Sequence, residues 1–271
     1  MVHGSDHGQR ATSCQERADG AWIWLFSGTA DGPPLASALL ERGWWVQVSV
    51  VTAAAARAYP AHPRLRLRIG PISSDAELQA ELLQLHPRAL VDATHPFAQE
   101  ISRRLQRLAP LTGMPLLSLQ RRHPEQAKPG EQLRWLDSVA DLAHRPLAGE
   151  RLLLAIGARQ LQEAVAASAS AEHFARVLDW PGSLQAARAA GLEDGHIACL
   201  RPDPTAHGAL EEALCRRWSI SVVLCRQGGG RSEAIWRQVC QRLSLPLLLL
   251  RQPSSHTRLP LPELLEKLGQ P

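Results

Sequence analysis

The sequence predicts an α/β protein that consists of two domains in tandem, each with a parallel β-sheet. From residue 22 onward, short apolar segments alternate with segments that carry apolar residues at helical spacing. The connections between them are short, which favours parallel strands joined by helices. The alternation becomes looser over residues 122–149, which contain several prolines and glycines, and then starts again. A chain of 271 residues has room for two such domains.

The first half contains five predicted strands and three predicted helices. The strands are expected at residues 22–26, 44–51, 65–69, 89–93 and 115–119. The helices are expected at residues 35–42, 75–85 and 97–109. Residues 65–69 alternate Leu with Arg and end in Ile, a pattern typical of a half-exposed strand near a sheet edge.

The second half repeats this organisation. One strand-like segment, residues 133–136, lies within the loose stretch. Further strands are expected at residues 151–156, 174–178, 197–200, 220–225 and 246–250, and helices at residues 160–169, 208–218 and 232–243. We expect a disordered extension at residues 1–20, a first domain at 21–145, a second at 146–253 and a tail at 254–271.

The charged residues favour a small polyanionic ligand over nucleic acid. The net charge is only +4, no run of five or six like charges occurs, and aromatic residues make up 4% of the chain. Of the 30 cationic residues, 28 are arginine, whose planar fork pairs with carboxylates and phosphates in bidentate fashion. The alternative is that most of these arginines are simply solvated at the surface.

Apolar runs and cysteines indicate a cytoplasmic location. The longest apolar run, residues 245–250, is too short to span a bilayer, and the first twenty residues lack the apolar core of a secretory signal. Five cysteines without a CxxC pair support neither a disulfide framework nor a zinc site, so no metal is expected and most cysteines are expected in the core. A core position is also the default for four tryptophans, although stacking on a ligand or an interface stays open: Trp44, Trp45, Trp180 and Trp236.

Two loops of the first domain are candidate binding sites, because ligands of such folds lie at the carboxyl ends of the strands. Residues 27–32 read SGTADG after the first strand, where glycines and a helix N-terminus favour a phosphate. Residues 92–98 read DATHPFA after the fourth strand. A tight turn without a ligand is the alternative for the first loop. For the second, the alternative is a helix-capping turn with Thr94 as N-cap and Pro96 near the first helical position.

Two loops of the second domain are suited to carboxylates or phosphates. Residues 226–232 read RQGGGRS, a glycine-rich turn that is flanked by arginines and opens a helix. Residues 157–159 read GAR and follow the first strand of this domain. An ordinary turn with a solvated arginine is the alternative for each loop.

Together these residues resemble the precorrin-6A reductase family of cobalamin biosynthesis. The most specific part is DATHPFA at residues 92–98, followed by Ile101-Ser102 and by GMPLL at residues 113–117. The GTA at residues 28–30, VSVVT at 48–52 and LAIGARQ at 154–160 are also similar. The resemblance spans roughly residues 22–253.

The resemblance implies two Rossmann-like domains with the active site in the cleft between them. It implies that a nicotinamide cofactor reduces one double bond of precorrin-6A, or of its cobalt form, to give the precorrin-6B form. The cofactor would be held by Gly28, Thr29, Ala30, Asp31, Thr52, Asp92, Thr94, His95, Pro96 and Phe97. The polycarboxylate tetrapyrrole would be held by Arg121, Gly157, Arg159, Arg226, Gly228, Gly229, Gly230 and Arg231. No catalytic side chain is identified.

The second domain departs from the family pattern at three places. The usual Lys-Asn/Asp-Ser-Gly-Gly reads RQGGG at residues 226–230, Trp236 replaces a lysine expected on the next helix, and a Gly-Pro-Phe turn reads RPDP at residues 201–204. These departures motivate an alternative function, a relative that binds nucleotide or tetrapyrrole without turnover. For the cofactor, we expect NADPH, with NADH as the alternative. No acidic residue follows the second strand at Thr52, and Arg57 nearby is suited to a 2′-phosphate.

Overall fold

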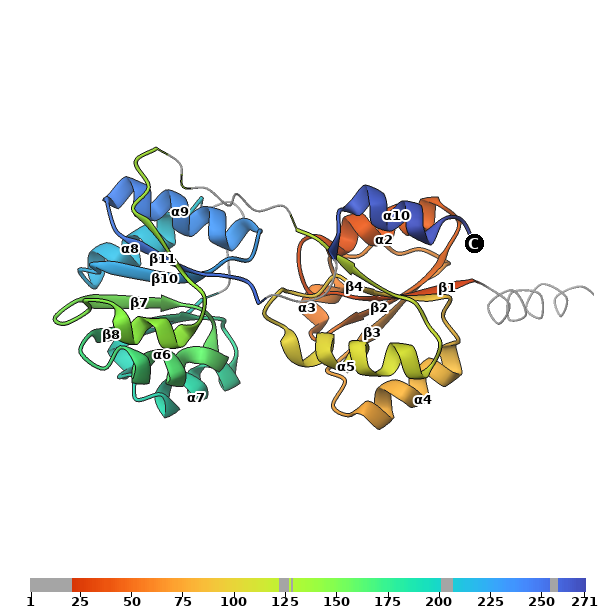
Figure 1. Cartoon of the computed structure of the whole chain (residues 1–271), viewed down its shortest axis with the longest axis horizontal. Helices are drawn as coiled ribbons and strands as arrows, with labels where there is room; N and C mark the ends of the chain where they lie inside the picture. Colours follow the sequence, from red (N-terminus) through yellow and green to blue (C-terminus); the bar gives the residue numbers. More distant parts are fainter. Residues whose placement is uncertain (1–20, 122–126, 128, 201–206, 254–257) are drawn as a thin grey trace, which may run out of the picture. The chain divides into compact units, whose positions relative to one another are not determined.

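The computed structural model describes residues 21–121, 127, 129–200, 207–253 and 258–271. The chain divides into two compact units, one made of Met1–Gln120 with Ser255–Pro271 and the other of Arg121–Ser254. Each unit contains one six-stranded sheet in which all paired strands are parallel (Figure 1). The predicted class, two α/β domains with parallel sheets, is therefore confirmed.

The first unit has the strand order β12-β5-β4-β1-β2-β3. Its strands are β1 (Trp22–Phe26), β2 (Trp45–Val50), β3 (Leu65–Ile69), β4 (Ala89–Asp92), β5 (Leu116–Leu119) and β12 (Arg258–Leu259). The order runs outward from β1 in one direction and then restarts from β4 in the other. The chain therefore changes direction between β1 and β4, and a ligand crevice is expected at their carboxyl ends. The predicted edge position of β3 is confirmed.

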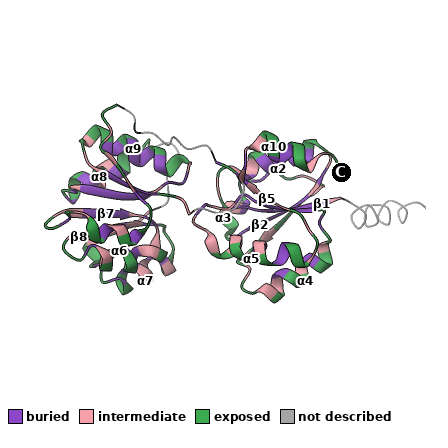
Figure 2. Ribbon diagram, in the orientation of Figure 1, coloured by how far each residue is buried: buried purple, intermediate pink, exposed green. Residues whose placement is uncertain are grey.

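Helices cover both faces of the first sheet (Figure 1). They are α2 (Gly32–Glu41), α3 (Ala53–Ala56), α4 (Asp75–Leu85), α5 (Gln99–Leu111) and α10 (Leu261–Leu268). Ile23 and Leu25 of β1 pack with α2 and α10, whereas Trp24 and Phe26 pack with α4 and α5. Because successive side chains of a strand point to opposite faces, β1 is buried on both sides and carries the centre of the core (Figure 2).

The second unit has the strand order β6-β11-β10-β7-β8-β9. Its strands are β6 (Leu133–Leu136), β7 (Arg151–Ala155), β8 (Glu172–Val177), β9 (Ile197–Cys199), β10 (Val222–Arg226) and β11 (Leu247–Leu250). Its helices are α6 (Leu161–Ala167), α7 (Pro181–Ala189), α8 (Ala209–Arg217) and α9 (Arg231–Leu243), with short 3₁₀ helices η1 (Val139–His144), η2 (Ala158–Gln160) and η3 (Asp194–His196). In Figure 1, α8 and α9 lie on one face and α6 and α7 on the other. The switch point of this sheet lies between β7 and β10.

The chain crosses between the two units twice, and each crossing leads to an edge strand of the sheet that it enters. After β5 the chain supplies β6 to the second sheet, and after β11 it supplies β12 to the first. The boundary expected near residue 145 is therefore wrong, because β6 pairs with β11. The expected tail at 254–271 is also wrong for its described part. Leu264 and Leu265 of α10 are buried, and the Arg42 Nη1 group donates to the Leu265 carbonyl at 3.1 Å.

All predicted strands are present within two residues of their expected ends, and all predicted helices within three. Helix α7 is an addition to the predicted helices, and its first two residues are Pro181 and Gly182. Trp44 and Trp236 are buried as expected, whereas Trp45 is half-buried and Trp180 is 66% exposed. The expected extension at residues 1–20 and the RPDP sequence at 201–204 lie outside the described residues.

The described cysteines agree with the expected core role. Cys215, Cys225 and Cys240 are buried and Cys199 is half-buried, and all four are free thiols. Burial raises the pKa of Cys215 to about 12 and the pKa of Cys225 well above its usual value. No group of three or more potential metal ligands occurs among the described residues. No helix in the described part of the chain is long and apolar enough to cross a membrane.

Candidate functional site

The turn between β1 and α2 is open at its glycine and is tied to the loop after β4. No atom lies within 4 Å of the position that a Cβ of Gly28 would occupy. The Thr29 hydroxyl lies 3.3 Å from Asp31 Oδ2 and 3.4 Å from the Ala93 carbonyl. The two predicted cofactor loops of this unit therefore meet at the switch point between β1 and β4.

The first turn of α2 contributes little to anion binding through its own N–H groups. Pro33 and Pro34 have no N–H. Gly32 donates to the Thr29 carbonyl at 3.1 Å and Leu35 to the Asp31 carbonyl at 3.2 Å. This geometry leaves few N–H groups of the α2 N-terminus for the anion that was expected there. In this chain the preceding loop, rather than the helix, would supply the donors.

Gly32 is required for the close approach of α2 to the loop. A Cβ at this position would lie 2.0 Å from Ser27 Oγ and 2.1 Å from the Tyr59 hydroxyl oxygen. Ser27 and Tyr59 are both buried. Burial raises the pKa of Tyr59, against a smaller lowering effect of the Ser27 hydroxyl. The neutral hydroxyl groups of Ser27 and Tyr59 therefore lie beneath Gly32, at the start of α2.

Asp92, at the end of β4, holds the following loop together. One carboxylate oxygen accepts from the Thr94 amide at 3.0 Å and from the Thr94 hydroxyl at 2.6 Å, and the other accepts from the Ser102 hydroxyl at 2.6 Å. Asp92 is buried. Its role in the structure is therefore to position the loop and to tie it to α5. Sequence reasoning missed the partnership with Ser102.

The loop after β4 is a turn of its own and does not cap α5. The residue that precedes the first turn of α5 is Ala98, so the alternative with Thr94 as N-cap is wrong. The Phe97 amide donates to His95 Nδ1 at 3.2 Å, and the Ala98 amide donates to the His95 carbonyl at 2.7 Å. His95 therefore stabilises the turn that displays Phe97.

Arg258 of β12 pairs in register with Ser118 of β5, which in turn pairs with Asp92 of β4. Burial lowers the pKa of the Arg258 guanidinium, and the negative charge of Asp92 counteracts this effect. Arg258 is a charged residue of this site that sequence reasoning missed. The signal was weak, because β12 is only two residues long and lies far along the chain from the rest of its sheet.

The region after β2 carries Thr52 and Arg57 at the two ends of the four-residue helix α3. The Thr52 hydroxyl accepts from the Ala55 amide at 3.2 Å as the N-cap of this helix. Arg57 is exposed at its end. No Asp or Glu occurs anywhere in residues 45–74. The structure places Thr52 after the neighbouring strand β2, at the start of α3, and not within the loops that meet between β1 and β4.

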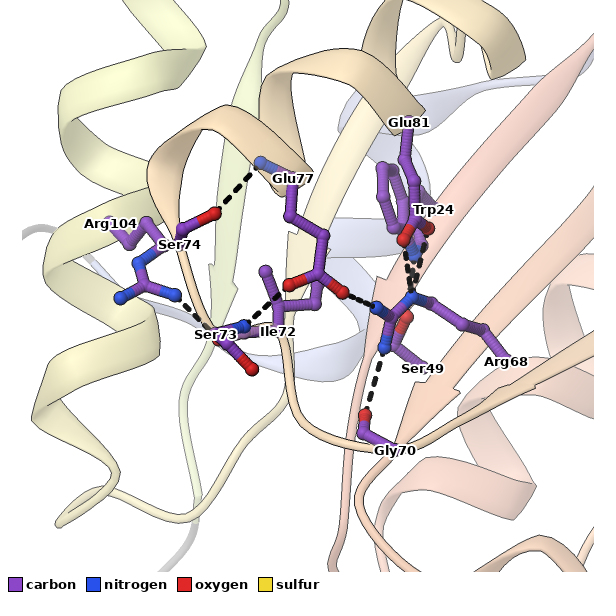
Figure 3. Close-up of polar contacts among 10 residues, drawn as sticks. All are labelled: Trp24, Ser49, Arg68, Gly70, Ile72, Ser73, Ser74, Glu77, Glu81 and Arg104. Carbon is purple, nitrogen blue, oxygen red and sulfur yellow. Dashed lines mark hydrogen bonds and ion pairs between the residues drawn. The ribbon is translucent and has the colours of Figure 1, made fainter.

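Arg68, at the carboxyl end of β3, is committed to an internal network (Figure 3). Its Nε lies 2.8 Å from both oxygens of Glu81, and its Nη2 lies 2.5 Å from Glu77 Oε1. Its Nη1 donates to the Gly70 carbonyl at 2.8 Å. Two carboxylates therefore neutralise Arg68, which excludes it as a simple phosphate-binding cation.

In the second unit, Arg226 and the turn after β7 meet at the switch point. Arg226 Nε and Nη2 donate to the Gln160 side-chain oxygen at 3.2 and 2.9 Å. Gly157 has a φ of +76°, and a Cβ there would lie 3.2 Å from Arg226 Nη1. Burial and the neighbouring charge of Arg159 lower the pKa of Arg226 to about 10. The negative charge of an anion bound here would stabilise the charged form of Arg226 and so counteract both causes of the lowered pKa.

The glycine loop after β10 is held from both sides. Arg121, which is buried, donates through Nη1 to the Gly228 carbonyl at 3.1 Å. The Gly229 amide donates to Glu233 Oε2 at 2.9 Å, and its φ of +62° suits glycine. Arg121 and Glu233 therefore each hold the glycine loop through one hydrogen bond.

Glu233 belongs to a buried ion-pair cluster. Arg237 Nε lies 3.0 Å from Glu233 Oε1, and Arg237 Nη1 lies 3.0 Å from Glu131 Oε2. The three side chains are 2–5% exposed. An open cavity of about 290 Å³ lies beside them, and Gly230 and the exposed Arg231 also line it. Arg231 is therefore near the glycine loop, on the cavity side.

Comparisons with known proteins identify the family of this chain. A family model described as "Precorrin-6x reductase CbiJ/CobK" matches residues 22–268. The chain belongs to this family. It is 33% identical to a precorrin-6A reductase of Rhodococcus erythropolis over 85% of this chain and 89% of that protein. It is 31% identical to a cobalt-precorrin-6A reductase of Synechocystis sp. over 87% of this chain and 90% of that protein.

A solved structure shares the fold. A structure described as "CobK precorrin-6A reductase" matches with a TM-score of 0.71 at 23% identity, over 93% of this chain and 99% of that one. The resemblance stated from the sequence is thus confirmed at the level of the family and of the fold. The predicted site residues fall into two groups, one at the carboxyl edge of each sheet, and their roles are argued below.

Proposed function

We propose that this chain is a cytoplasmic, NADPH-dependent reductase that converts precorrin-6A, or its cobalt form, to the precorrin-6B form. Family membership and the names of its relatives support the reaction. The observation that carries the proposal is that the carboxyl edges of the two sheets present different kinds of residues. The first presents a glycine turn and hydroxyls, as a nucleotide site does, and the second presents arginines, as a polycarboxylate site does.

The first unit would bind the cofactor. The space around Gly28 lets a pyrophosphate approach the backbone, and the amides of Gly28, Thr29 and Ala30 would be its donors. The loop of Thr94 to Phe97, which Asp92 fixes, would orient the nicotinamide end. The bound nicotinamide supplies a hydride, while this chain's residues bind, orient and exclude water.

The preference for NADPH follows from the charges near β2. No carboxylate is present in residues 45–74 to accept from a ribose 2′-hydroxyl. Of the arginines there, Arg64 donates to the Gly43 and Leu40 carbonyls, Arg66 lies over the Trp22 ring, and Arg68 is paired with two glutamates. Arg57 is exposed at the end of α3 and would bind the 2′-phosphate.

The second unit would bind the macrocycle through its carboxylates. Arg226 and Arg159 lie together at the switch point, and Arg121 and Arg231 accompany the glycine loop. Two guanidinium groups near each other are mutually unfavourable until an anion lies between them. Arg226 stands where the family usually has a lysine. Arginine keeps the positive charge, and its planar guanidinium donates hydrogen bonds in more than one direction.

The test is anaerobic oxidation of NADPH by the purified protein with precorrin-6A and with its cobalt form. The proposal predicts oxidation that depends on one of the macrocycles, and an Arg57→Ala variant whose KM for NADPH rises while its KM for NADH does not. Binding of both ligands without oxidation would show a non-catalytic relative and contradict the proposal.

A further inference from the structure

An exposed aromatic side chain stands at the carboxyl edge of the second sheet. Trp180 follows β8, is 66% exposed, and lies two residues after Leu178, which is 54% exposed. Strand β8 pairs with β7, and α7 packs against η2, which follows β7. Trp180 therefore lies on the same edge as the Gly157 turn and Arg159.

The indole ring is held in place. A Cβ on Gly182 would lie 2.3, 2.7 and 2.9 Å from three atoms of the six-membered ring of Trp180, so the ring lies against the backbone of Gly182. The Trp180 amide donates to the Leu178 carbonyl at 2.8 Å, and the Trp180 carbonyl accepts from the Ser183 amide at 2.9 Å. Pro181 begins α7 with a fixed φ. The result is a flat apolar surface with a set orientation.

Charges differ on the two sides of this ring. Toward β7 lie Arg159 and Arg226, of which the second is half-buried and carries a lowered pKa because of burial and of the charge of Arg159. Toward β9 lies Asp179, whose charge raises the pKa of Cys199, after burial as the main cause. A flat polyanion on the ring of Trp180 would thus find its cationic partners on the β7 side.

We infer that Trp180 is a stacking surface for the conjugated ring of the substrate, with Arg159 and Arg226 receiving carboxylates at its rim. This inference rests on the proposed function and adds a residue that determines ring affinity. A large apolar ring at the surface is costly in water, and contact with the face of a flat conjugated ligand removes that cost. Arginines beside it distinguish a polycarboxylate ring from a neutral one.

Steady-state kinetics of Trp180→Ala and Trp180→Phe would test the inference, with Leu111→Ala, a 79% exposed position on α5, as the matched control. We expect Trp180→Ala to raise the KM for the macrocycle about tenfold and to leave the Kd for NADPH unchanged. Trp180→Phe keeps an aromatic face and should stay within about threefold of the wild type. Leu111→Ala should change neither constant.

Binding of uroporphyrin, a stable polycarboxylate tetrapyrrole, is measured in parallel because it needs no turnover. Loss of uroporphyrin binding in Trp180→Ala but not in Leu111→Ala supports stacking, even if the wild type oxidises no NADPH and the reductase proposal fails. An active wild type with an unchanged macrocycle KM in Trp180→Ala overturns stacking and leaves the reductase proposal intact. Equal losses in the Ala and Phe variants, or a dimer that the Ala variant dissociates, would also overturn it.

Discussion

Replacing Arg237 with methionine should destabilise the second unit far more than replacing an exposed arginine of the same helix. Arg237 bridges Glu131 and Glu233 at 3.0 Å each, and all three side chains are 2–5% exposed. Removing one partner of a buried pair costs about 3–5 kcal/mol, because the other charge stays buried without its counterion. Two carboxylates are left here, so we expect the upper end, about 5 kcal/mol.

The cysteines provide the assay. Cys215, Cys225 and Cys240 are all buried in the second unit, and burial raises the pKa of each thiol. Brief exposure to iodoacetamide at increasing urea, followed by peptide mass spectrometry, therefore measures unfolding of this unit alone. With a slope of about 2 kcal/mol per molar urea, the midpoint for Arg237→Met should fall by about 2.5 M.

Arg242→Met is the matched control, because Arg242 lies on the same helix but is 43% exposed and pairs with the part-exposed Glu212. Such a pair is worth at most about 1 kcal/mol, or about 0.5 M in the midpoint. Adding Glu131→Gln and Glu233→Gln to Arg237→Met should restore much of the loss, since neutral amides cost less to bury. Equal midpoints for Arg237→Met and Arg242→Met would refute the reasoning.

Three further outcomes follow from the site geometry. Gly157→Ala should raise the KM for the macrocycle and leave the Kd for NADPH unchanged, because φ is +76° and the new Cβ would lie 3.2 Å from Arg226 Nη1; unchanged kinetics would contradict it. Asp92→Ala should weaken NADPH binding about tenfold in calorimetry, through loss of the hydrogen bonds that hold Thr94 and Ser102; an unaltered Kd would show that the loop does not contact the cofactor. Burial lowers the pKa of His173, so the unfolded chain binds this proton more readily and stability should fall as the pH drops through about 6.5. His173→Asn should flatten that part of the profile in urea titrations between pH 5 and 8, and parallel profiles would contradict the assignment.

Local patterns were sufficient to predict most of the fold. Fully apolar runs such as residues 22–26 and 247–250 are typical of strands that are buried on both faces, and both form internal strands of their sheets. The half-exposed pattern of residues 65–69 identified the edge strand β3. These signals depend on neighbours in sequence, which is why they were read correctly.

Long-range pairings were not predicted. The segment at residues 133–136 was recognised as strand-like, but its partner β11 follows more than a hundred residues later. β12 has two residues and no periodicity, so α10 was assigned to a tail and Arg258 was missed. The pairings of β6 with β11 and of β12 with β5 join segments that are far apart in the sequence, so no local pattern predicts them.

At the candidate site, the sequence predicted the positions of the loops but not the hydrogen bonds within them. Glycines and polar residues after the strands located the turns at residues 27–32, 92–98 and 226–232. The position of Asp92 within a hydrogen-bond network, with both oxygens engaged, depends on Ser102 of a helix that packs alongside. The exposure of Trp180 likewise depends on the position of α7, a helix that was not among the predicted ones.

The central claim is hydride transfer from NADPH to the macrocycle, and mass spectrometry of the product tests it most directly. The purified protein is incubated without oxygen with precorrin-6A, or its cobalt form, and NADPH that carries deuterium at nicotinamide C4 in either configuration. With one of the two labelled cofactors, we predict a product that gains one deuterium, transferred as the hydride, and one hydrogen taken up as a proton. With the other labelled cofactor, the hydride carries ordinary hydrogen and the product gains two hydrogens, of which the second is again taken up as a proton. Recovery of unchanged macrocycle, under conditions in which both ligands are shown to bind, would contradict the claim.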